Sequence, residues 1–423
     1  MSSDFAGLYL GIDLGTSGAR GSLIDHEGNE LASARADLPA TQLPEQWKQA
    51  AFDVIRELTT GVGATRIHAI AIDGTSGTVM LCDQNGQPCS PALMYYDQSY
   101  TAEAELVATK APADCPARGA SASLAKVLHL LPQAQGAAHI CHQADWIAGL
   151  LCGRFDISDE NNALKLGYDP VACVWPTWLD ELGIPRNLLP RVYAPGSVVT
   201  NITTSAASEL GLPSDCRLVA GTTDSIAAFI ATGANNIGDG VTSLGSTLVL
   251  KLACDRPVFS SELGVYSHRL GAIWLAGGAS NSGGGVLRRY FTQRQIDLMT
   301  PKLDLDKPTG LEDYPLARKG ERFPYNDPNR NPVLEPRPEN DVEFFQAMLE
   351  GIARIEKQGY DTLANLGAPK VKKVITAGGG SVNPAWSSIR ERQLGVPVLT
   401  AKHAEASYGA ALLASGISTF SAT

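Results

Sequence analysis

An aspartate followed by two hydroxyl side chains in a glycine-rich turn is the first feature of this sequence that could do chemistry. The stretch LGIDLGTSGARGSLID, residues 10–25, places Asp13 between apolar residues and then passes through Thr16 and Ser17. The flanking apolar residues and the glycines predict a strand–turn–strand hairpin with Asp13 near the end of its first strand. Backbone N–H groups in such a turn can bind phosphate oxygens, and a strand-end carboxylate can hold Mg²⁺, commonly through water.

The same stretch excludes two common nucleotide-binding loops. A dinucleotide fingerprint has G-x-G-x-x-G at the start of a helix, and a P-loop has G-K-[ST] after its glycines. Neither pattern occurs in residues 10–25, and the chain resumes as a strand directly after the turn. Any phosphate bound here would therefore contact a hairpin turn and not a helix N-terminus.

Two further segments of the first half end an apolar run in an acidic residue. The stretch IHAIAIDGTSGT, from residue 67, predicts a strand that ends near Asp73 and a loop that contains Ser76. The stretch CRLVAGTTDSIAAF, from residue 216, predicts a buried strand, a short loop and a helix that begins at Asp224. An aspartate at that position is either a helix cap or a base that accepts a proton, and both roles stay open on the residues alone.

The second half of the chain repeats this plan. The stretch GVTSLGSTLVLKLACD, from residue 240, predicts a second hairpin, whose turn contains Gly245, Ser246 and Thr247. Further on, KVITAGGGSVN, from residue 373, predicts a strand followed by a glycine-rich loop, in which missing side chains leave space for a ligand. Two halves that each open with a hairpin of this type indicate a duplicated α/β unit.

In this order the motifs resemble those of the FGGY carbohydrate kinases. The stretches that carry the resemblance are GIDLGTSGARG, AIDGTSGT, AGTTDSIAAF, SLGSTLVL, GGASNSGG, AGGGSVNPAW and EASYGAALLA. The resemblance implies an α/β fold of two ribonuclease-H-like domains of the actin/Hsp70/sugar-kinase superfamily with a cleft between them. The expected domains are residues 1–230, completed by a C-terminal helix at 405–423 and binding sugar, and residues 231–404, binding nucleotide.

The resemblance also implies roles for individual residues. Asp224 is the expected catalytic base and Asp13 the expected Mg²⁺ ligand. The expected substrate-binding residues are Asp13, Ser76, Asp97 and Asp224. ATP is expected to contact Thr16, Ser17, Gly245, Ser246, Thr247, Gly378, Gly379, Gly380 and Asn383. Around Asp97 the sequence reads Tyr-Tyr-Asp-Gln-Ser, where the family has Trp-Asn-Asp-Gln-Arg, so the family's Trp and Arg are missing there.

Composition limits the other classes of function. The 423 residues carry a formal net charge of −10, which argues against general affinity for nucleic acid or an anionic membrane. The eight cysteines form no C-x-x-C pair, as is typical of thiols in a reducing compartment. The N-terminus lacks the features of a signal peptide. We therefore expect a cytoplasmic (or, in a plant, plastid) monomer or homodimer that binds only a sugar and ATP.

Within the family, the closest resemblance is to short cyanobacterial and plant members that are xylulose-kinase-like and act as D-ribulose kinases. It rests on AIDGTSGTVMLCD and ALKLGYDP. It implies ATP-dependent phosphorylation of the terminal hydroxyl of a ketopentose, D-ribulose, to D-ribulose 5-phosphate. The alternatives are a kinase for D-xylulose or another polyol, and a catalytically idle regulator that binds sugar or nucleotide. A third possibility is another enzyme of the superfamily that acts on an acid or amino sugar. It would be expected to carry basic residues near the substrate loops, and the loop IDGTSGT has none.

Overall fold

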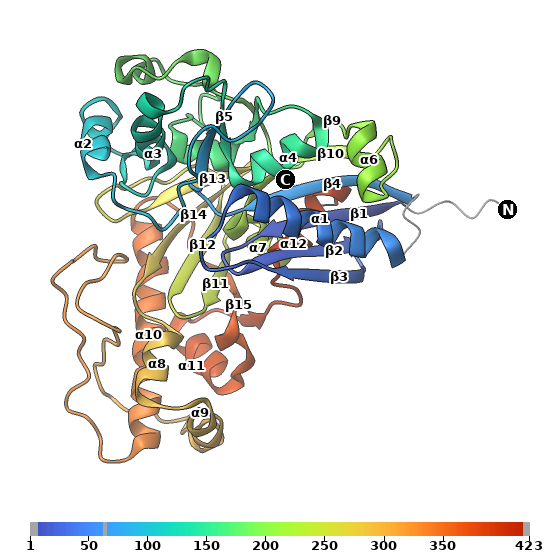
Figure 1. The fold of residues 1–423 in the computed structure, drawn as a ribbon. Helices are drawn as coiled ribbons and strands as arrows, with labels where there is room; N and C mark the ends of the chain where they lie inside the picture. Colours follow the sequence, from blue (N-terminus) through green and yellow to red (C-terminus); the bar gives the residue numbers. More distant parts are fainter. Residues whose placement is uncertain (1–6, 62–65, 418–423) are drawn as a thin grey trace. The chain divides into compact units, whose positions relative to one another are not determined.

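The computed structural model describes residues 7–61 and 66–417 and divides the chain into two compact units (Figure 1). The first unit contains the described residues up to Ala231, the short segment His268–Gly271 and the residues from Glu405 onward. The second unit contains Thr232–Ser267 and Ala272–Ala404. Each unit is built on its own six-stranded sheet, and we describe the two separately.

The sheet of the first unit has the strand order β3-β2-β1-β4-β10-β9. Its strands are β1 (Leu8–Leu14), β2 (Gly18–Ile24), β3 (Glu30–Asp37), β4 (Ile67–Gly74), β9 (Val198–Asn201) and β10 (Arg217–Thr223). Strand β4 pairs in parallel with β1 on one side and with β10 on the other. The carboxyl ends of these three central strands therefore lie at one edge of the sheet.

Helices cover both faces of this sheet, which explains why β1 is apolar along nearly its whole length. Helix α1 (Pro44–Gly61) packs on one face, where a Cβ on Gly21 would come within 2.5 Å of Val54 and 3.2 Å of Ile12. Helix α12 (Ala406–Ser415) packs on the other, because a Cβ on Gly11 would lie 2.0 Å from the carbonyl oxygen of Ser407. Neighbouring strand residues point to opposite faces, so Ile12 and Gly11 contact different helices.

The C-terminal helix α12 belongs to the first unit. It also packs against α7 (Asp224–Ala231), where a Cβ on Gly409 would lie 1.9 Å from the carbonyl oxygen of Ala227. Ser407 Oγ lies 2.9 Å from Ser22 Oγ of strand β2. The helix that ends the described chain thus covers the sheet with which the chain begins.

The rest of the first unit forms a smaller layer around a second apolar cluster that includes Val79, Leu124 and Val127. Two short sheets lie here, one of antiparallel β5 (Val79–Cys82) and β6 (His139–His142), the other of parallel β7 (Ile157–Asp159) and β8 (Arg191–Tyr193). Helices α2 (Thr101–Lys110) and α3 (Ser123–Leu130) pack in this cluster, and the short helix α5 (Glu160–Ala163) follows β7. Helices α4 (Gln143–Cys152) and α6 (Thr204–Leu210) pack instead in the core of the main sheet, which includes Trp146 and Leu210. Residues 139–142 pair with β5, and helix α4 begins directly after them, at Gln143.

The second unit repeats the pairing pattern of the first. Its strand order is β13-β14-β12-β11-β15-β16. The strands are β11 (Asp239–Leu244), β12 (Leu248–Cys254), β13 (Tyr266–Leu270), β14 (Ile273–Ser280), β15 (Lys373–Ala377) and β16 (Val398–Thr400). The last three residues of the edge strand β13 belong to the short segment that is counted with the first unit. Strand β11 pairs antiparallel with β12 and parallel with β15, as β1 pairs with β2 and β4. This repeat confirms the predicted α/β fold of two related domains.

Four helices belong to the second unit: α8 (Gly284–Tyr290), α9 (Gln293–Met299), α10 (Asp341–Asn365) and α11 (Pro384–Leu394). A buried ion pair joins the last two, because Arg390 Nε donates to Glu356 Oε2 over 2.6 Å. Glu356 also accepts a 2.6 Å hydrogen bond from Thr242 of strand β11. A charge pair buried in this way needs every partner, so it fixes both helices against the sheet. Of the helices that the structure describes, none is long and apolar enough to span a membrane.

Candidate functional site

Three aspartates of the first unit lie at the carboxyl ends of its central parallel strands. Asp13 of β1 is the direct neighbour of Asp73 of β4, and Asp73 in turn pairs with Thr222 of β10. Asp224 follows two residues later and begins helix α7. Asp13 is 4% exposed and Asp73 is fully buried, whereas Asp224 is half-buried. The fold therefore brings together two of the predicted site residues, Asp13 and Asp224, and places between them Asp73, which was not among the expected site residues.

Burial raises the pKa of Asp13, and the Arg20 guanidinium, 3.5 Å from Asp13 Oδ2, only partly offsets that effect. The pKa of Asp73 is raised well above its usual value by burial and then by the negative charge of Asp13. Among the described residues no donor reaches either carboxyl oxygen of Asp73 or Oδ1 of Asp13, although the two carboxyl groups can share a proton with each other. Buried polar atoms without partners are uncommon in folded proteins, and here they mark a place that can accept a ligand.

The predicted hairpin turn is present, closed by a backbone hydrogen bond and contacted by a side chain from another segment. Gly15 N donates to Gly18 O over 3.0 Å, which leaves the side chains of Thr16 and Ser17 exposed. Thr16 Oγ1 lies 3.0 Å from the hydroxyl oxygen of Tyr95. Tyr95 is thus a neighbour of the turn that the sequence pattern gave no reason to expect.

The loop after β4, residues 75–78, carries the predicted substrate residue Ser76, which is half-buried. Its neighbour Thr75 is buried, and Gln143 Oε1 accepts hydrogen bonds from Thr75 N over 3.1 Å and from Thr75 Oγ1 over 2.7 Å. Thr75 Oγ1 also lies 2.6 Å from Thr78 Oγ1. The buried threonines therefore anchor the loop, and Ser76 is the hydroxyl residue of the loop that stays accessible.

Asp97, the remaining predicted substrate residue of this unit, uses its carboxylate within its own turn. Oδ1 accepts hydrogen bonds from Ser99 N over 3.0 Å and from Ser99 Oγ over 2.7 Å, and Oδ2 accepts one from Tyr100 over 3.0 Å. These bonds, with those of Ser99 first, lower the pKa of Asp97. The structure gives Asp97 a clear role as a turn residue.

A polar turn that sequence reasoning missed supports the strand before Asp224. Asn161 Nδ2 donates to Thr222 Oγ1 over 2.9 Å, and Asn162 Nδ2 donates to Thr222 O over 3.3 Å. Asp159 caps α5, accepting from Asn161 N and Asn162 N, and burial raises its pKa to about 7. The sequence signal was the polar run SDENN directly after a short apolar segment, a pattern that also occurs in ordinary surface turns.

In the second unit, the second predicted hairpin joins β11 to β12. Gly284 N donates to Gly245 O over 2.9 Å, and Gly285 N donates to Ser246 O over 3.1 Å. Arg288, one turn further along α8, donates to Ser246 Oγ over 2.8 Å. The glycines at 283–285 therefore pack against the hairpin, and an arginine that the sequence did not single out lies beside its exposed serine.

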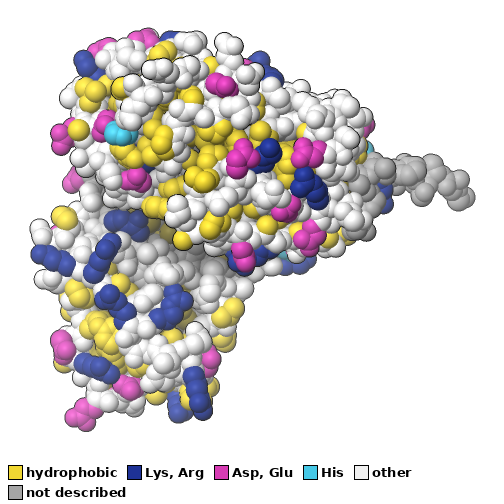
Figure 2. Space-filling view, in the orientation of Figure 1, with side chains coloured by type: hydrophobic (Ala, Val, Ile, Leu, Met, Phe, Trp, Pro, Cys, Tyr) yellow, Lys and Arg dark blue, Asp and Glu magenta, His cyan; other side chains and the backbone are white. Residues whose placement is uncertain are grey.

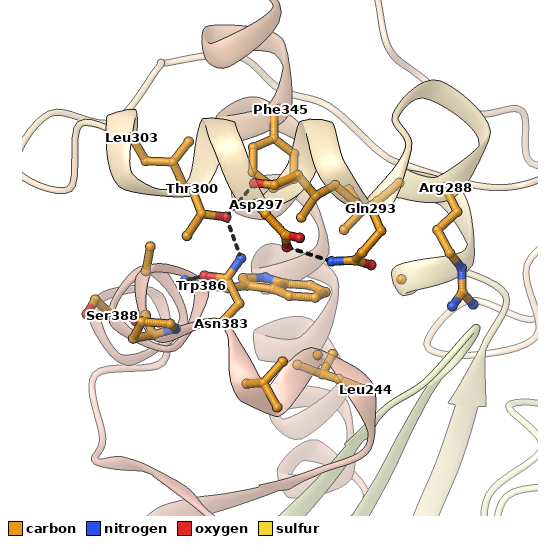
Figure 3. Close-up of a pocket in the computed structure, with 18 of the residues that line it drawn as sticks. Leu244, Arg288, Gln293, Asp297, Thr300, Leu303, Phe345, Asn383, Trp386 and Ser388 are labelled. Atoms are coloured by element: carbon orange, nitrogen blue, oxygen red, sulfur yellow. Dashed lines mark hydrogen bonds between the residues drawn. The ribbon is translucent and has the colours of Figure 1, made fainter.

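A cavity of ≈ 830 Å³ opens next to this hairpin, within the second unit. Five of the predicted nucleotide contacts line it: Gly245, Ser246, Gly379, Gly380 and Asn383. Asn383 Nδ2 donates to Thr300 Oγ1 over 3.2 Å. Figure 3 shows Asn383 and Trp386 facing the side chains of Gln293, Asp297 and Thr300. The volume and the mixed apolar and polar lining suit a nucleoside.

The three glycines of the predicted adenosine loop meet different requirements. Gly378 has φ +83°, and a Cβ there would lie 2.9 Å from Leu244 O, so the backbone conformation itself favours glycine. A Cβ on Gly380 would lie 2.8 Å from Leu244 Cβ and 2.9 Å from Trp386. A Cβ on Gly379 would meet no described atom within 4 Å. Of the three, Gly379 therefore leaves open space at the cavity.

Positive charge is available near this cavity. Figure 2 shows Lys and Arg side chains gathered over the part of the second unit that carries α8, α9 and α10.

Within the described residues there is no cluster of three or more His, Cys, Asp or Glu side chains that could hold a metal ion by itself. The partnerless oxygens of Asp13 and Asp73 are nevertheless of the kind that a hydrated Mg²⁺ ion takes as ligands.

Comparison with protein families finds two matching domains. Residues 8–114 match the N-terminal domain of the FGGY family of carbohydrate kinases, and residues 240–416 match its C-terminal domain. A curated relative, the autoinducer-2 kinase of Yersinia enterocolitica serotype O:8 / biotype 1B, is 24% identical over 98% of this chain and 87% of its own length.

Solved structures share the fold at low sequence identity. A xylulose kinase from Brucella ovis (named as a xyloylose kinase) has a TM-score of 0.86 and 23% identity, over 96% of this chain and 90% of its own. A gluconate kinase from Lactobacillus acidophilus has a TM-score of 0.85 and 20% identity, over 98% and 90%. Plasmodium falciparum glycerol kinase with ADP has a TM-score of 0.85 and 17% identity, over 99% and 91%. The names differ in substrate, so these similarities do not confirm the expected D-ribulose kinase subtype.

Proposed function

Because this chain belongs to the FGGY family of carbohydrate kinases, which use ATP, we propose that it transfers the terminal phosphoryl group of ATP to D-ribulose, giving D-ribulose 5-phosphate. The observation that carries the kinase chemistry is the alignment of Asp13, Asp73 and the start of α7 at the ends of three adjacent parallel strands. The ketopentose is supported by the resemblance of AIDGTSGTVMLCD and ALKLGYDP to the short ribulose-acting members.

Asp224 is the proposed base. Phosphoryl transfer needs the acceptor hydroxyl to lose its proton, and a weak base suffices because that loss comes late in a loose transition state. Asp224 is half-buried at the start of α7, with Oδ1 accepting from Ser225 N over 2.7 Å. Thr222, held by the two asparagines of α5, fixes the backbone that leads to it. Such fixed positioning supplies much of the rate in reactions of this type.

The sugar is proposed to bind in the first unit and the nucleotide in the second. Ser76 would donate to and accept from sugar hydroxyls, together with Asp13 and Asp224; Asp97 stays a candidate contact. The exposed Thr16 and Ser17, and Gly245, Ser246 and Thr247 of the second hairpin, would bind the phosphates. Gly378, Gly379, Gly380 and Asn383 would border the adenosine, and Arg288 beside Ser246 would add a cation for phosphate.

Asp13 is the proposed ligand of Mg²⁺, which neutralises phosphate charge when bound. The unpartnered Asp13 Oδ1 and the neighbouring Asp73 carboxyl fit that group. Asp13 and Asp73 themselves present carboxyl oxygens at the buried ends of two adjacent strands, and they hold or release protons there. Retention of Asp13, Thr16 and Asp224 together supports an enzyme over an idle regulator, since a binding protein needs no base.

A coupled ADP-release assay across D-ribulose, L-ribulose, D-xylulose, glycerol and D-gluconate tests the proposal. We expect D-ribulose to give the highest kcat/KM. One misplaced hydrogen bond costs about 1–3 kcal/mol, so the preference over the epimer D-xylulose should be roughly ten- to hundredfold. A clear preference for D-xylulose or glycerol would contradict D-ribulose as the substrate but would leave the kinase activity supported. If none of these compounds caused release of ADP, the proposal that the substrate is a ketopentose would be contradicted.

A further inference from the structure

Two lysines meet at the loop that carries Ser76, although the loop itself contains no basic residue. Lys126 of α3 donates from Nζ to Gly77 O over 2.9 Å and to Met94 O over 2.7 Å. Lys165 donates from Nζ to Ser76 O over 3.5 Å. The two ammonium groups are close enough that Lys165 contributes to lowering the pKa of Lys126, after burial. The substrate loop therefore lies in a locally positive environment, which its own sequence does not reveal.

The two lysines differ in what surrounds their charged groups. Lys126 is fully buried, and its two short hydrogen bonds go to backbone carbonyls of separate loops. It thus joins the loop after β4 to the segment around Met94 and has a positioning role. Lys165 is only half-buried, as is Ser76, and its contact with Ser76 O is longer. Of the pair, Lys165 is the lysine with access to the solvent side of the loop.

The backbone around Lys165 fixes where its ammonium lies. Lys165 belongs to a single 3-10 turn, Leu164–Leu166, that continues directly from α5. The same segment holds Thr222, two residues before Asp224, through Asn161 and Asn162. At its other end the Lys165 stem packs at Gly77, where a Cβ would lie 3.5 Å from Lys165 Cδ. One short segment therefore links the strand of the proposed base to the loop of the proposed sugar contact.

We propose that the Lys165 ammonium contacts the substrate beside Ser76 and selects an oxygen that only accepts hydrogen bonds. The inference rests on the proposed function, because it takes Ser76 as a sugar contact. An ammonium has N–H donors and no acceptor, so it pairs better with a ketone or carboxylate oxygen than with a hydroxyl, which must also place its own proton. The site would accept ketoses, or aldonic acids, over the corresponding alditols.

Three ligands with one carbon skeleton test this selection: D-ribulose, D-ribonate and ribitol. We would measure kcat/KM with ATP, and Kd by calorimetry, for the wild type, Lys165→Met and Lys165→Gln. Lys110→Met, an exposed lysine paired with Glu181, is the matched control. Circular dichroism and the KM for ATP report whether each variant is folded. In the wild type we expect D-ribulose or D-ribonate to exceed ribitol by about tenfold or more.

In Lys165→Met the preferred ligand should lose about tenfold or more while ribitol changes little, so that the ratio falls toward one. Lys165→Gln should gain relative activity on ribitol, because its amide oxygen can accept from a hydroxyl. If only D-ribulose exceeds ribitol, the group that Lys165 contacts is a ketone. If only D-ribonate exceeds ribitol, that group is a carboxylate. An unchanged ratio in folded Lys165→Met would overturn the inference. Failure of turnover with preserved, Lys165-dependent binding would instead contradict the proposed function.

Discussion

Asp13 and Asp73 occupy directly paired positions at the carboxyl ends of two parallel strands, and both side chains are buried. Two carboxyl groups placed in this way cannot both ionise without a large electrostatic cost. Burial acts first on each of them, and the charge of Asp13 then raises the pKa of Asp73 further. The pair therefore holds a proton more tightly in the folded protein than in the unfolded chain, which makes stability depend on pH.

Asp73→Asn should stabilise the protein at neutral pH. A carboxyl whose folded pKa is raised binds more protons in the folded state, so wild-type stability falls as pH rises from about 4 toward the raised pKa of Asp73. Asparagine has nearly the same shape and does not ionise. We expect a higher Tm than wild type at pH 7 and a smaller difference at pH 4, measured by differential scanning calorimetry. The exposed Asp53→Asn should show no such trend; equal Tm curves for Asp73→Asn and wild type would contradict the prediction.

Asp224→Asn should lose kcat by about three orders of magnitude or more, because the amide cannot accept the acceptor's proton. Binding of ADP, measured by calorimetry, should stay within about twofold of wild type, since the proposed nucleotide contacts lie elsewhere. The neighbouring exposed Ser225→Ala is the control and should be nearly silent. If Asp224→Asn kept more than about a tenth of wild-type kcat, Asp224 would be a helix-start residue and not the base.

Lys126→Met should raise the KM for the sugar by about tenfold, because the loop after β4 loses the hydrogen bonds that hold it to the segment around Met94. The pKa of Lys126 is lowered to about 8, by burial first and then by Lys165, with Asp97 acting in the opposite direction. Below about pH 8 the group is mainly an ammonium, and above that pH it becomes a neutral amine, whose hydrogen bonds to the two carbonyls are weaker because they are no longer charge-assisted. The wild-type sugar KM should rise between pH 8 and 9, whereas that of Lys126→Met should not. A parallel rise in both proteins would remove Lys126 from this role.

Gly379→Ala and Gly380→Ala should have different effects, the first on nucleotide binding and the second on the packing of the protein. A methyl group at position 379 meets open space, so the variant should keep its Tm but raise the KM for ATP about threefold or more. A methyl group at position 380 would lie 2.8 Å from Leu244 Cβ, so that variant should lose thermal stability. Melting curves and ATP titrations of both proteins check this. Equal effects of the two substitutions on KM would argue that Gly379 does not border the nucleotide.

The local sequence pattern was sufficient to predict those elements of the fold that depend on residues close together in the chain. Alternating apolar residues around glycine turns predicted the hairpins at Asp13 and at Gly245, and the helix begun by Asp224 followed from the strand before it. The repeat of the hairpin, together with motif order, predicted two related α/β domains, which strand pairing and the family match confirm. The D-ribulose subtype stays a proposal, since epimers differ by the direction of one hydroxyl group.

The sequence by itself determined the hairpins, the strand-end acids and the family, because turn chemistry and apolar periodicity act over a few residues. Only the tertiary structure placed Asp73 beside Asp13, Lys165 at the carbonyl of Ser76 and Arg288 at the hydroxyl of Ser246. The parallel pairing of β1 with β4 joins Asp13 to Asp73, which lies 60 positions further along the chain. The Lys165 side chain reaches the loop of Ser76 from a 3-10 turn 89 positions away in the sequence. No local pattern encodes such distances, because they depend on how whole elements pack.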